Sequence, residues 1–389
     1  MTRAYPFGPQ HRLDVDPLFA ELRSSEPVTR VRMPHGGDAW LVTTYAEAKA
    51  VFGDDRRFGR AMTVGADVPR ARPVIQASRS IHTMDPPEHT SLRRMVSKAF
   101  TVRRVAELES RTQRIVDDLL DRMTTPADLV KELAEPLPIT VICELLGVPY
   151  ADREEFHAWS DAAVALTAYT PDQVLDARIN LVTYLCRLTE QRREHPSDDL
   201  LTGLVQAGGH LSEFEIASFG VALLVAGHAT TVNQIGNFTC VLLEHPGELA
   251  RLRADPSLLP TAIEELLRFT PLAAVAEFPQ MALADLELGG VHIKAGDTVL
   301  VELASVNRDP KVFTDPDVLD LGRTPNPHLA FAHGAHHCLG AQLARMELRV
   351  AIGSLVRRFP ALRLAVPPDQ LEFIDGQLIR GLRSLPVSW

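Results

Sequence analysis

The stretch from residue 212 to residue 243 constrains the fold most, because apolar residues recur along it with the period of an α-helix. Ser212 and Glu215 match a capping box at its start, and His245-Pro246 ends the pattern. A helix of about thirty residues is long for a globular protein, so we expect it to cross the core. Polar residues directly follow its apolar centre, VALLVAG, and each buried one needs a partner: His228, Thr230, Thr231, Asn233 and Gln234.

Helical periodicity dominates the rest of the chain as well, and predicts further helices at 103–124, 130–147, 172–194, 258–269 and 340–359. Strand signals are short and lie at 38–45 and 286–293, where Gly289-Gly290 predicts a tight hairpin turn. We find no Gly/Ser-rich linker and no internal repeat. The sequence therefore predicts a mainly α fold with a minor β region, as a single domain over residues 1–389.

The overall charge and the N-terminus bear on where the chain works. A net charge of −10 argues against nucleic acid or an anionic membrane as the main partner. The N-terminal MTRAYPFGPQHRLD resembles no targeting segment. No stretch approaches the roughly 20 consecutive apolar residues that span a bilayer, so we expect a cytoplasmic, unanchored protein.

Cysteine spacing singles out one thiol. Cys143, Cys186 and Cys240 lie in apolar helical segments, where cysteine usually acts as a small buried hydrophobe, and no C-x-x-C pair suggests a zinc site. Cys338 lies instead in FAHGAHHCLG, directly before an amphipathic helix. Glycines there let the backbone approach a flat ligand, and the N–H groups of a helix start favour a thiolate.

This loop resembles the haem-binding signature of the cytochrome P-450 family, Phe-x-x-Gly-x-His-x-Cys-x-Gly. The resemblance implies that Cys338 binds the iron of haem b, with O2 as co-substrate, and that the long helix lies over the haem in a cytochrome P-450 fold. Further family motifs follow in the same order along nearly the whole chain. Every fixed position of the signature is matched, by Phe331, Gly334, His336, Cys338 and Gly340.

The second motif is the pair Glu265 and Arg268 in TAIEELLRF, which share a helix face at i and i+3. Taken alone, such a pair could be a surface ion pair of little energetic value. The resemblance implies that it joins Arg323 and that the three residues brace the cysteine loop.

The third motif is DPPEHTSLRR, in which Asp85 and Glu88 match a capping box. His89 and Arg93 follow at i and i+4, so they share a helix face. The resemblance implies that both bind a haem propionate together with His336, and the arginine fork suits a carboxylate. The alternative is a solvated helix end without a ligand.

The fourth motif, AGHATT at 226–231, lies in the long helix. It resembles the family's oxygen-binding stretch, which implies that Gly227 leaves room for dioxygen. Thr230 can donate a hydrogen bond to the carbonyl of Ala226 four residues earlier and loosen the helix there. Such back-bonding without a catalytic role is the alternative.

Two residues depart from the family pattern. Gln280 stands where relatives commonly carry an arginine for a propionate, so a donor is kept but a charge is lost. Ala229 stands where relatives usually carry an acid that relays protons. Cleaving the O–O bond needs two protons, so another route or another reaction is required. Asn233 shares the face of Ala229 and could hold a water.

The resemblance also implies where the substrate and the redox partner bind. The substrate regions are largely apolar, which favours a hydrophobic compound, although each residue alone could be plain core; they contain Gln76, Ile81, Val225, Val275, Ala276 and Leu378. A ferredoxin, reduced by an NAD(P)H-dependent reductase, would dock behind the cysteine loop by electrostatic attraction. Each basic residue suited to this could alone belong to a solvated helix face; they are Arg94, Lys98, Arg103, Arg104, Arg345 and Arg349.

Three functions are compatible with these motifs. The first is a monooxygenase that hydroxylates or epoxidises a specialised metabolite, with Cys338 directing electron density to the iron. The second is oxidative coupling or ring formation without oxygen insertion, which the missing acid at Ala229 favours. The third is a haem protein without catalysis that helps a partner enzyme, although this chain keeps Cys338, Glu265, Arg268 and Thr230.

Overall fold

The computed structural model describes residues 2–8, 11–73, 75–76, 79–100, 102–164, 169–207 and 212–389. The chain folds into two compact units. Unit 1 consists of Met1–Leu92, His245–Leu339 and Leu378–Arg380, and unit 2 of Arg93–Glu244, Gly340–Gln377 and Gly381–Trp389. Each unit gathers segments that are distant in sequence, so no single point in the chain separates them. That residues 1–389 form one domain stays a prediction.

Unit 1 contains the minor β region that the sequence predicts. Its largest sheet among the described residues has the order β1-β2-β3-β9-β6-β4. β3 pairs parallel with β9, and β6 pairs antiparallel with β9 on its other edge. The strands are β1 Arg3–Ala4, β2 Val28–Arg32, β3 Asp38–Val42, β4 Phe58–Gly59, β6 Gln280–Ala282 and β9 Thr298–Val301.

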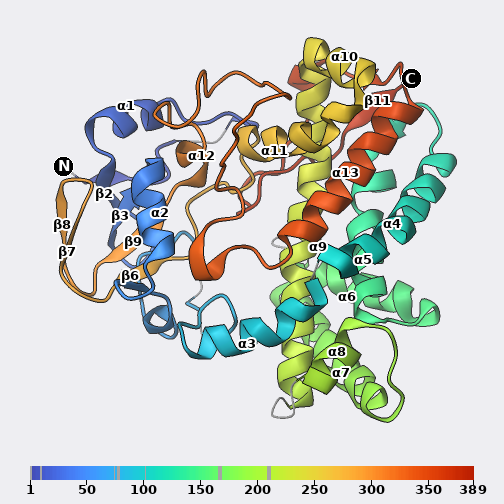
Figure 1. Ribbon diagram of the computed structural model, residues 1–389, viewed down its shortest axis with the longest axis horizontal. Helices are drawn as coiled ribbons and strands as arrows, with labels where there is room; N and C mark the ends of the chain where they lie inside the picture. The colour runs from blue at the N-terminus through green and yellow to red at the C-terminus, as the bar shows by residue number, and fades with distance from the viewer. Residues whose placement is uncertain are drawn as a thin grey trace. The chain divides into compact units, whose positions relative to one another are not determined.

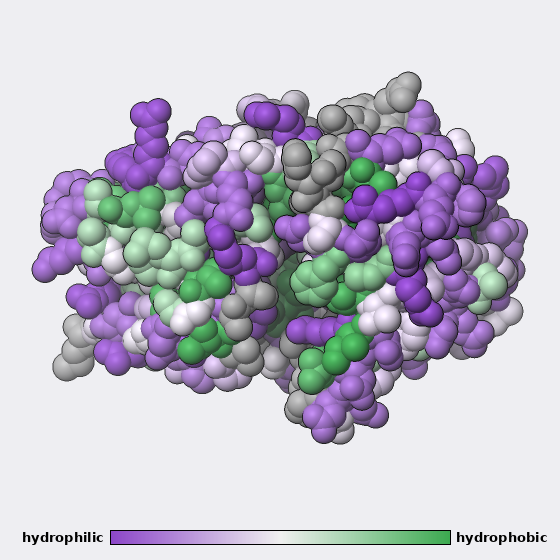
Figure 2. All heavy atoms as spheres, turned by 90° about the horizontal axis from the view of Figure 1, so that it is seen from below, coloured by the Kyte–Doolittle hydropathy of each residue, from purple (hydrophilic) through white to green (hydrophobic). Residues whose placement is uncertain are grey.

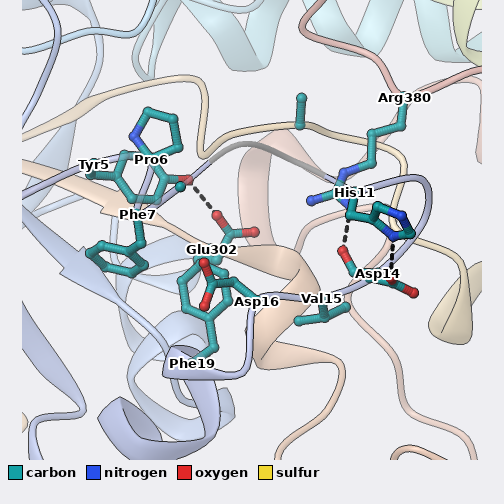
Figure 3. Close-up of a pocket in the computed structure, with 12 residues that line it drawn as sticks. Tyr5, Pro6, Phe7, His11, Asp14, Val15, Asp16, Phe19, Glu302 and Arg380 are labelled. Carbon is teal, nitrogen blue, oxygen red and sulfur yellow. Dashed lines mark hydrogen bonds and ion pairs between the residues drawn. The ribbon is translucent and has the colours of Figure 1, made fainter. Parts of the chain in front are cut away.

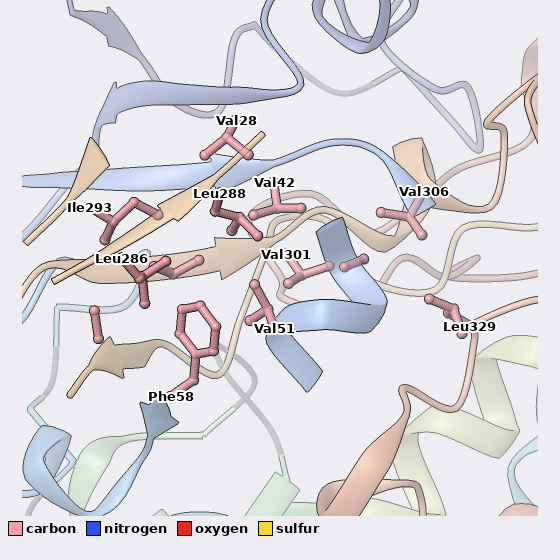
Figure 4. Close-up of a cluster of buried hydrophobic side chains, with 13 residues drawn as sticks. Val28, Val42, Val51, Phe58, Leu286, Leu288, Ile293, Val301, Val306 and Leu329 are labelled. Carbon is pink, nitrogen blue, oxygen red and sulfur yellow. The ribbon is translucent and has the colours of Figure 1, made fainter. Parts of the chain in front are cut away.

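The predicted hairpin is present as β7 Leu286–Leu288 and β8 Val291–Ile293, with Leu288 opposite Val291. Gly289 and Gly290 have φ of 56° and 81°, as a two-residue turn with left-handed backbone requires. The hairpin packs Leu286, Leu288 and Ile293 into a buried apolar cluster with side chains of the sheet and of α2 (Figure 4).

Helices and short 3₁₀ turns complete unit 1. Figure 1 shows α11, which carries the Glu-x-x-Arg motif, beside the segments that lead into the cysteine loop. The elements are α1 Leu18–Ser25, α2 Tyr45–Gly53, η1 Ala61–Thr63, α10 Pro246–Ala254, η5 Pro256–Leu258, α11 Leu259–Phe269, α12 Leu303–Val306 and η6 Gly334–His336. α3, Glu88–Val96, carries the chain from unit 1 into unit 2.

Unit 2 is mainly helical and is built around α9, Glu213–Glu244, which packs against α5, α7 and α13 (Figure 1). The predicted capping box is confirmed, since the Glu215 N–H donates to Ser212 Oγ and the Ser212 N–H to the Glu215 carboxylate. The other helical elements are η2 Ser97–Phe100, α4 Val102–Arg122, α5 Pro136–Leu146, η4 Tyr150–Asp152, α6 Arg153–Val164, α7 Pro171–Glu194, α8 Leu200–Ala207, α13 Ala341–Arg358 and η7 Pro368–Gln370.

The predicted helix at 130–147 is divided in the structure. A π-helical turn, η3 Val130–Ala134, precedes α5, which begins at Pro136. Proline lacks an N–H and is favoured in the first turn of a helix, so Pro136 starts a new helix instead of continuing the old one. A small sheet of β10 Arg363–Leu364, β11 Pro386–Ser388 and β5 Ala127–Asp128 completes unit 2.

Among the described residues, one helix is long and apolar enough to cross a membrane by length and composition, namely α9. The expectation that no stretch approaches that length was therefore wrong. This is weak evidence for a membrane span, because the core helix of a soluble protein passes the same test, and α9 packs against several helices of its own unit. Hydrophilic residues cover most of the face in Figure 2, and hydrophobic ones form separate patches.

Candidate active site

The cysteine of the loop 331–340, Cys338, is exposed in the protein. Its N–H donates to the carbonyl of Phe331 at 2.9 Å, which closes the loop on itself. α13 begins three residues later at Ala341, with Gly340 as its N-cap. Cys143 is buried instead, and burial raises the pKa of its thiol to about 12. Of these two thiols, Cys338 is the one placed to bind a metal as a thiolate.

The three glycines of the motifs serve different purposes. At Gly334, φ is 70° and an added Cβ would lie 2.0 Å from the carbonyl oxygen of Phe52, so only glycine fits against α2. An added Cβ at Gly340 or Gly227 would meet no atom within 4 Å. Packing against protein therefore explains Gly334, whereas Gly340 and Gly227 each border open space. This suits a bulky group such as haem.

His89 and His336 lie together, as the resemblance predicts. Their ring centroids are 4.2 Å apart, and His89 is almost fully buried. Arg93 lies one turn beyond His89 on α3 and is half-buried. Gln280 is buried on β6, where it pairs with Val299.

The predicted capping box at Asp85 and Glu88 does not appear among the described hydrogen bonds. The two carboxylate oxygens of Asp85 accept from the backbone N–H groups of Arg60 and Ala61, at 2.8 and 3.0 Å. Glu88 pairs with Arg79. The segment before α3 is thus tied to the residues after β4, because the Asp85 carboxylate binds the backbone there and not the N–H groups of α3.

The structure brings Glu265, Arg268 and Arg323 together in unit 1. Arg268 Nε and Nη2 each donate to the Glu265 carboxylate at 2.8 Å, and both side chains are fully buried. Arg323 Nε lies 3.0 Å from both oxygens of the same carboxylate. Backbone carbonyls of residues 307, 314–316 and 318 accept further hydrogen bonds from the two guanidinium groups. This is a buried, hydrogen-bonded cluster and not a surface ion pair.

Further residues connect this cluster to the cysteine loop, and sequence reasoning missed them. Asn326 Nδ2 donates to Glu265 at 3.1 Å, and His328 Nε2 lies 3.0 Å from Glu264. Asn307 Oδ1 accepts from the Leu329 N–H at 2.8 Å, two residues before the loop begins. No local pattern marks these partners, because each contact joins residues more than 20 positions apart in the sequence.

The AGHATT motif at 226–231 lies on an unbroken stretch of α9 in unit 2. Thr230 Oγ1 donates to the carbonyl of Ala226 at 2.7 Å, as predicted. α9 runs continuously from Glu213 to Glu244, so Thr230 does not end the helix, and its loosening there stays a prediction. Asn233 Nδ2 donates to the carbonyl of Ala229 at 2.7 Å, so one of its N–H groups is used within the helix.

The predicted substrate residues differ in their surroundings. Val275 and Ala276 are buried in one apolar cluster of unit 1, and Leu378 packs against it. Ile81 is buried, whereas Gln76 is exposed. Val225 lies on α9 in unit 2 and is half-buried.

Some of the basic residues proposed for a redox partner can be placed. Arg94 is exposed on α3, and Arg349 of α13 pairs with Glu109 at 3.5 Å. Arg345 is half-buried on α13. The side chains of Lys98, Arg103 and Arg104 lie outside the described part of the chain.

A family model described as cytochrome P-450 matches residues 167–381. Nocardicin C N-oxygenase from Nocardia uniformis subsp. tsuyamanensis is 49% identical, over 100% of this chain and 99% of that protein. Mycinamicin IV hydroxylase/epoxidase from Micromonospora griseorubida is 45% identical, over 100% and 98%.

Solved structures agree with these relatives. The LnmA cytochrome P-450 hydroxylase from the leinamycin biosynthetic pathway of Streptomyces atroolivaceus is 49% identical, with a TM-score of 0.95 and full coverage of both chains. A cytochrome P-450 described as having biaryl coupling reactivity is 43% identical, with a TM-score of 0.92 and the same coverage. The predicted fold class, mainly α with a minor β region, is confirmed.

Proposed function

Because this chain belongs to the cytochrome P-450 family of monooxygenases, we propose that it hydroxylates or epoxidises a largely hydrophobic specialised metabolite. The observation that carries the proposal is the exposed Cys338 thiol directly before α13. Haem bound there, as haem b, would supply the activation of O2, which side chains alone cannot perform. The proposed catalytic and haem contacts come from motifs that the family resemblance assigns to this chain.

The residues around Cys338 have distinct proposed tasks. Cys338 holds the iron as a thiolate, and the nearby start of α13 stabilises its negative charge. His89, Arg93 and His336 bind the propionates by hydrogen bonds and charge. Gln280 offers an amide donor without charge, which makes the potential near the propionates less positive.

On α9, Gly227 leaves room for dioxygen, and the Thr230 hydroxyl is a candidate to hand on protons. With Ala229 in place of an acid, protons must come through water or through the substrate itself. Asn233 keeps a second N–H and its carbonyl oxygen for contacts with water.

The relatives bear on the substrate class. Two of them are named as enzymes acting on nocardicin C and mycinamicin IV. In this chain, Val275, Ala276 and Leu378 are apolar, which favours a hydrophobic substrate. We propose electron supply by a ferredoxin and its NAD(P)H-dependent reductase, in the cytoplasm.

Oxidative coupling is the second candidate, and two observations favour it. Ala229 cannot carry a proton, and one structural neighbour is described as having biaryl coupling reactivity. Coupling or ring formation makes a C–C, C–N or C–O bond with loss of hydrogens and inserts no oxygen. A non-catalytic helper protein is disfavoured, because this chain has both the Glu265–Arg268–Arg323 cluster and the cysteine loop.

The first test is the spectrum of the reduced carbonyl complex. Wild-type protein should be red and should show the strongly red-shifted Soret band of thiolate ligation, and Cys338→Ser should lose it. The control variants Cys143→Ser, Cys186→Ser and Cys240→Ser should keep the band. Loss of the band in one of them would mean that this cysteine, and not Cys338, binds the iron. Mass analysis of the product then separates the candidates, since hydroxylation adds one oxygen and coupling removes hydrogens.

A further inference from the structure

Residues 273–277, between α11 and β6 in unit 1, connect several segments that are proposed to surround the substrate. The Ala274 N–H donates to the carbonyl of Leu378 at 2.8 Å, and Ala273 forms an isolated bridge with Ile379. The stretch after α11 is therefore held by its backbone to residues 378–380, which we call the C-terminal turn.

Arg72, in the described stretch 64–73 that precedes Gln76 and Ile81, reaches the same segment through an ion pair. The guanidinium of Arg72 pairs with the carboxylate of Glu277, of which only 19% is exposed. Burial raises the pKa of Glu277, although Arg72 opposes this shift. A carboxyl group that is costly to bury thus holds Arg72 to residues 273–277.

The N-terminal segment supplies a further contact that sequence patterns did not indicate. The Ala276 N–H donates to the Tyr5 hydroxyl oxygen at 2.5 Å, across 271 residues of sequence. The same hydroxyl donates to Glu302, which follows β9 (Figure 3). Tyr5 and Ala276 are both almost fully buried.

Packing holds Tyr5 in place for this contact. The Tyr5 N–H donates to the Arg32 carbonyl at 2.9 Å, beyond the pairing of β1 with β2. Its ring lies edge-on to Phe7 with centroids 5.4 Å apart, and it shares an apolar cluster with Val275 and Ala276. Arg380 Nη1 donates to the Asp14 carbonyl at 2.6 Å and ties the C-terminal turn to the N-terminal segment. A cavity of about 70 Å³ lies beside these residues.

We propose that Tyr5 is a positioning residue for the substrate pocket, acting through the backbone of Ala276. The inference rests on the proposed function, because it takes residues 273–277 as part of the pocket wall. Without the hydroxyl, the buried Ala276 N–H loses its acceptor, and the segment must shift or admit water to satisfy it. The wall of the pocket then changes shape, while the haem contacts do not.

Two azoles of different size test this in the haem-loaded protein. Both bind iron through a ring nitrogen, and the Soret shift gives their Kd. In Tyr5→Phe, the Kd of bulky clotrimazole should rise about tenfold, since one buried hydrogen bond is lost. The Kd of small imidazole should stay within about twofold, because imidazole need not touch the walls.

Two variants serve as controls. Tyr45→Phe removes a hydroxyl that donates to the Pro327 carbonyl at 2.6 Å, away from residues 273–277, and should leave both Kd values unchanged. Glu302→Gln keeps an oxygen that accepts from Tyr5 and should retain clotrimazole binding. If the Kd of clotrimazole rises in Tyr5→Phe but not in Glu302→Gln, the lost contact that matters is the one between Tyr5 and Ala276.

Three outcomes would overturn the inference. The first is unchanged clotrimazole binding in Tyr5→Phe, and the second is an equal weakening of both azoles. If Tyr5→Phe retains no haem, Arg72→Gln tests the same segment from its exposed side and should raise the Kd of clotrimazole about threefold; an unchanged Kd is the third outcome. A wild-type protein that binds neither haem nor azoles overturns the proposed function as well.

Discussion

At the residue scale, residues of the same type differ in chemistry because some are buried and others are exposed. Cys338 is exposed, whereas the thiol of Cys143 is buried and its pKa is raised to about 12, so only the former is poised to bind as a thiolate. Among the acids, Glu347 on α13 is buried, and its Oε2 has no hydrogen-bond partner among the described residues. Burial raises the pKa of Glu347 to about 8.

The raised pKa of Glu347 predicts a stability that falls as pH rises. Between its ordinary value of 4.5 and about 8, the folded state holds a proton that the unfolded state has released. The free energy of unfolding should therefore lose about 1.4 kcal/mol per pH unit from this group over that window. Glu347→Gln cannot ionise, so denaturant unfolding at pH 5.5 and pH 7.5 should show a shallower pH dependence, by about that slope.

An exposed glutamate provides the comparison. Glu190 lies on α7 in the same unit, and Glu190→Gln should leave the pH dependence of unfolding as in wild type. Equal slopes for Glu347→Gln and wild type would mean that Glu347 is ionised in the folded protein.

At the element scale, the Glu-x-x-Arg helix α11 shows how a short motif becomes a buried structure. Glu265 alone accepts from Arg268, Arg323, Asn326 and the Asp320 N–H. The segment it holds leads directly into the cysteine loop. The energetic value of the cluster lies in keeping every charge paired, since an isolated buried charge is far more costly than a buried pair.

Breaking this cluster should release the cysteine loop. In Glu265→Ala, Arg268 and Arg323 lose their shared carboxylate, which should lower the free energy of unfolding by about 3–5 kcal/mol. Purified Glu265→Ala and Arg268→Ala should therefore contain little haem, as measured by the ratio of Soret to protein absorbance.

Arg251 offers a matched control close to the cluster. It pairs with Asp320 at 2.8 Å, but both side chains are about half exposed, so Arg251→Ala should cost little and keep its haem. Full haem content in Glu265→Ala would show that the cluster does not support the loop.

Local patterns predicted much of this architecture, and the failures share a cause. The predicted helix at 172–194 corresponds to α7 Pro171–Glu194, because periodicity and capping act within a few residues. Asp85 matched a capping pattern but binds backbone groups of residues 60 and 61. The contact of Tyr5 with Ala276 leaves no local signal, because tertiary packing alone brings them together.

At the scale of the whole molecule, charge is the property that bears on the proposed redox partner. The chain carries 40 basic and 50 acidic residues, so an acidic ferredoxin is repelled on average and must be guided by local basic groups. Arg94 is such a group, exposed on α3 five residues after His89. Steering of this kind acts over about 10 Å at 0.1 M salt and weakens as salt is added.

Reversing the charge at Arg94 should therefore slow encounter more than any later step. For Arg94→Glu, the second-order rate of reduction by ferredoxin at low ionic strength should fall about three- to tenfold, and its dependence on salt should become weaker. Arg383→Glu makes the same change of charge in the same unit, at a side chain that is 65% exposed, and should leave the rate nearly unchanged. Stopped-flow reduction at several ionic strengths gives both quantities. Equal effects of the two substitutions would mean that only net charge matters, and no effect of either would place docking on another face. A larger effect at Arg94 would connect the start of α3, where His89 is proposed to hold the haem, with the surface through which electrons arrive.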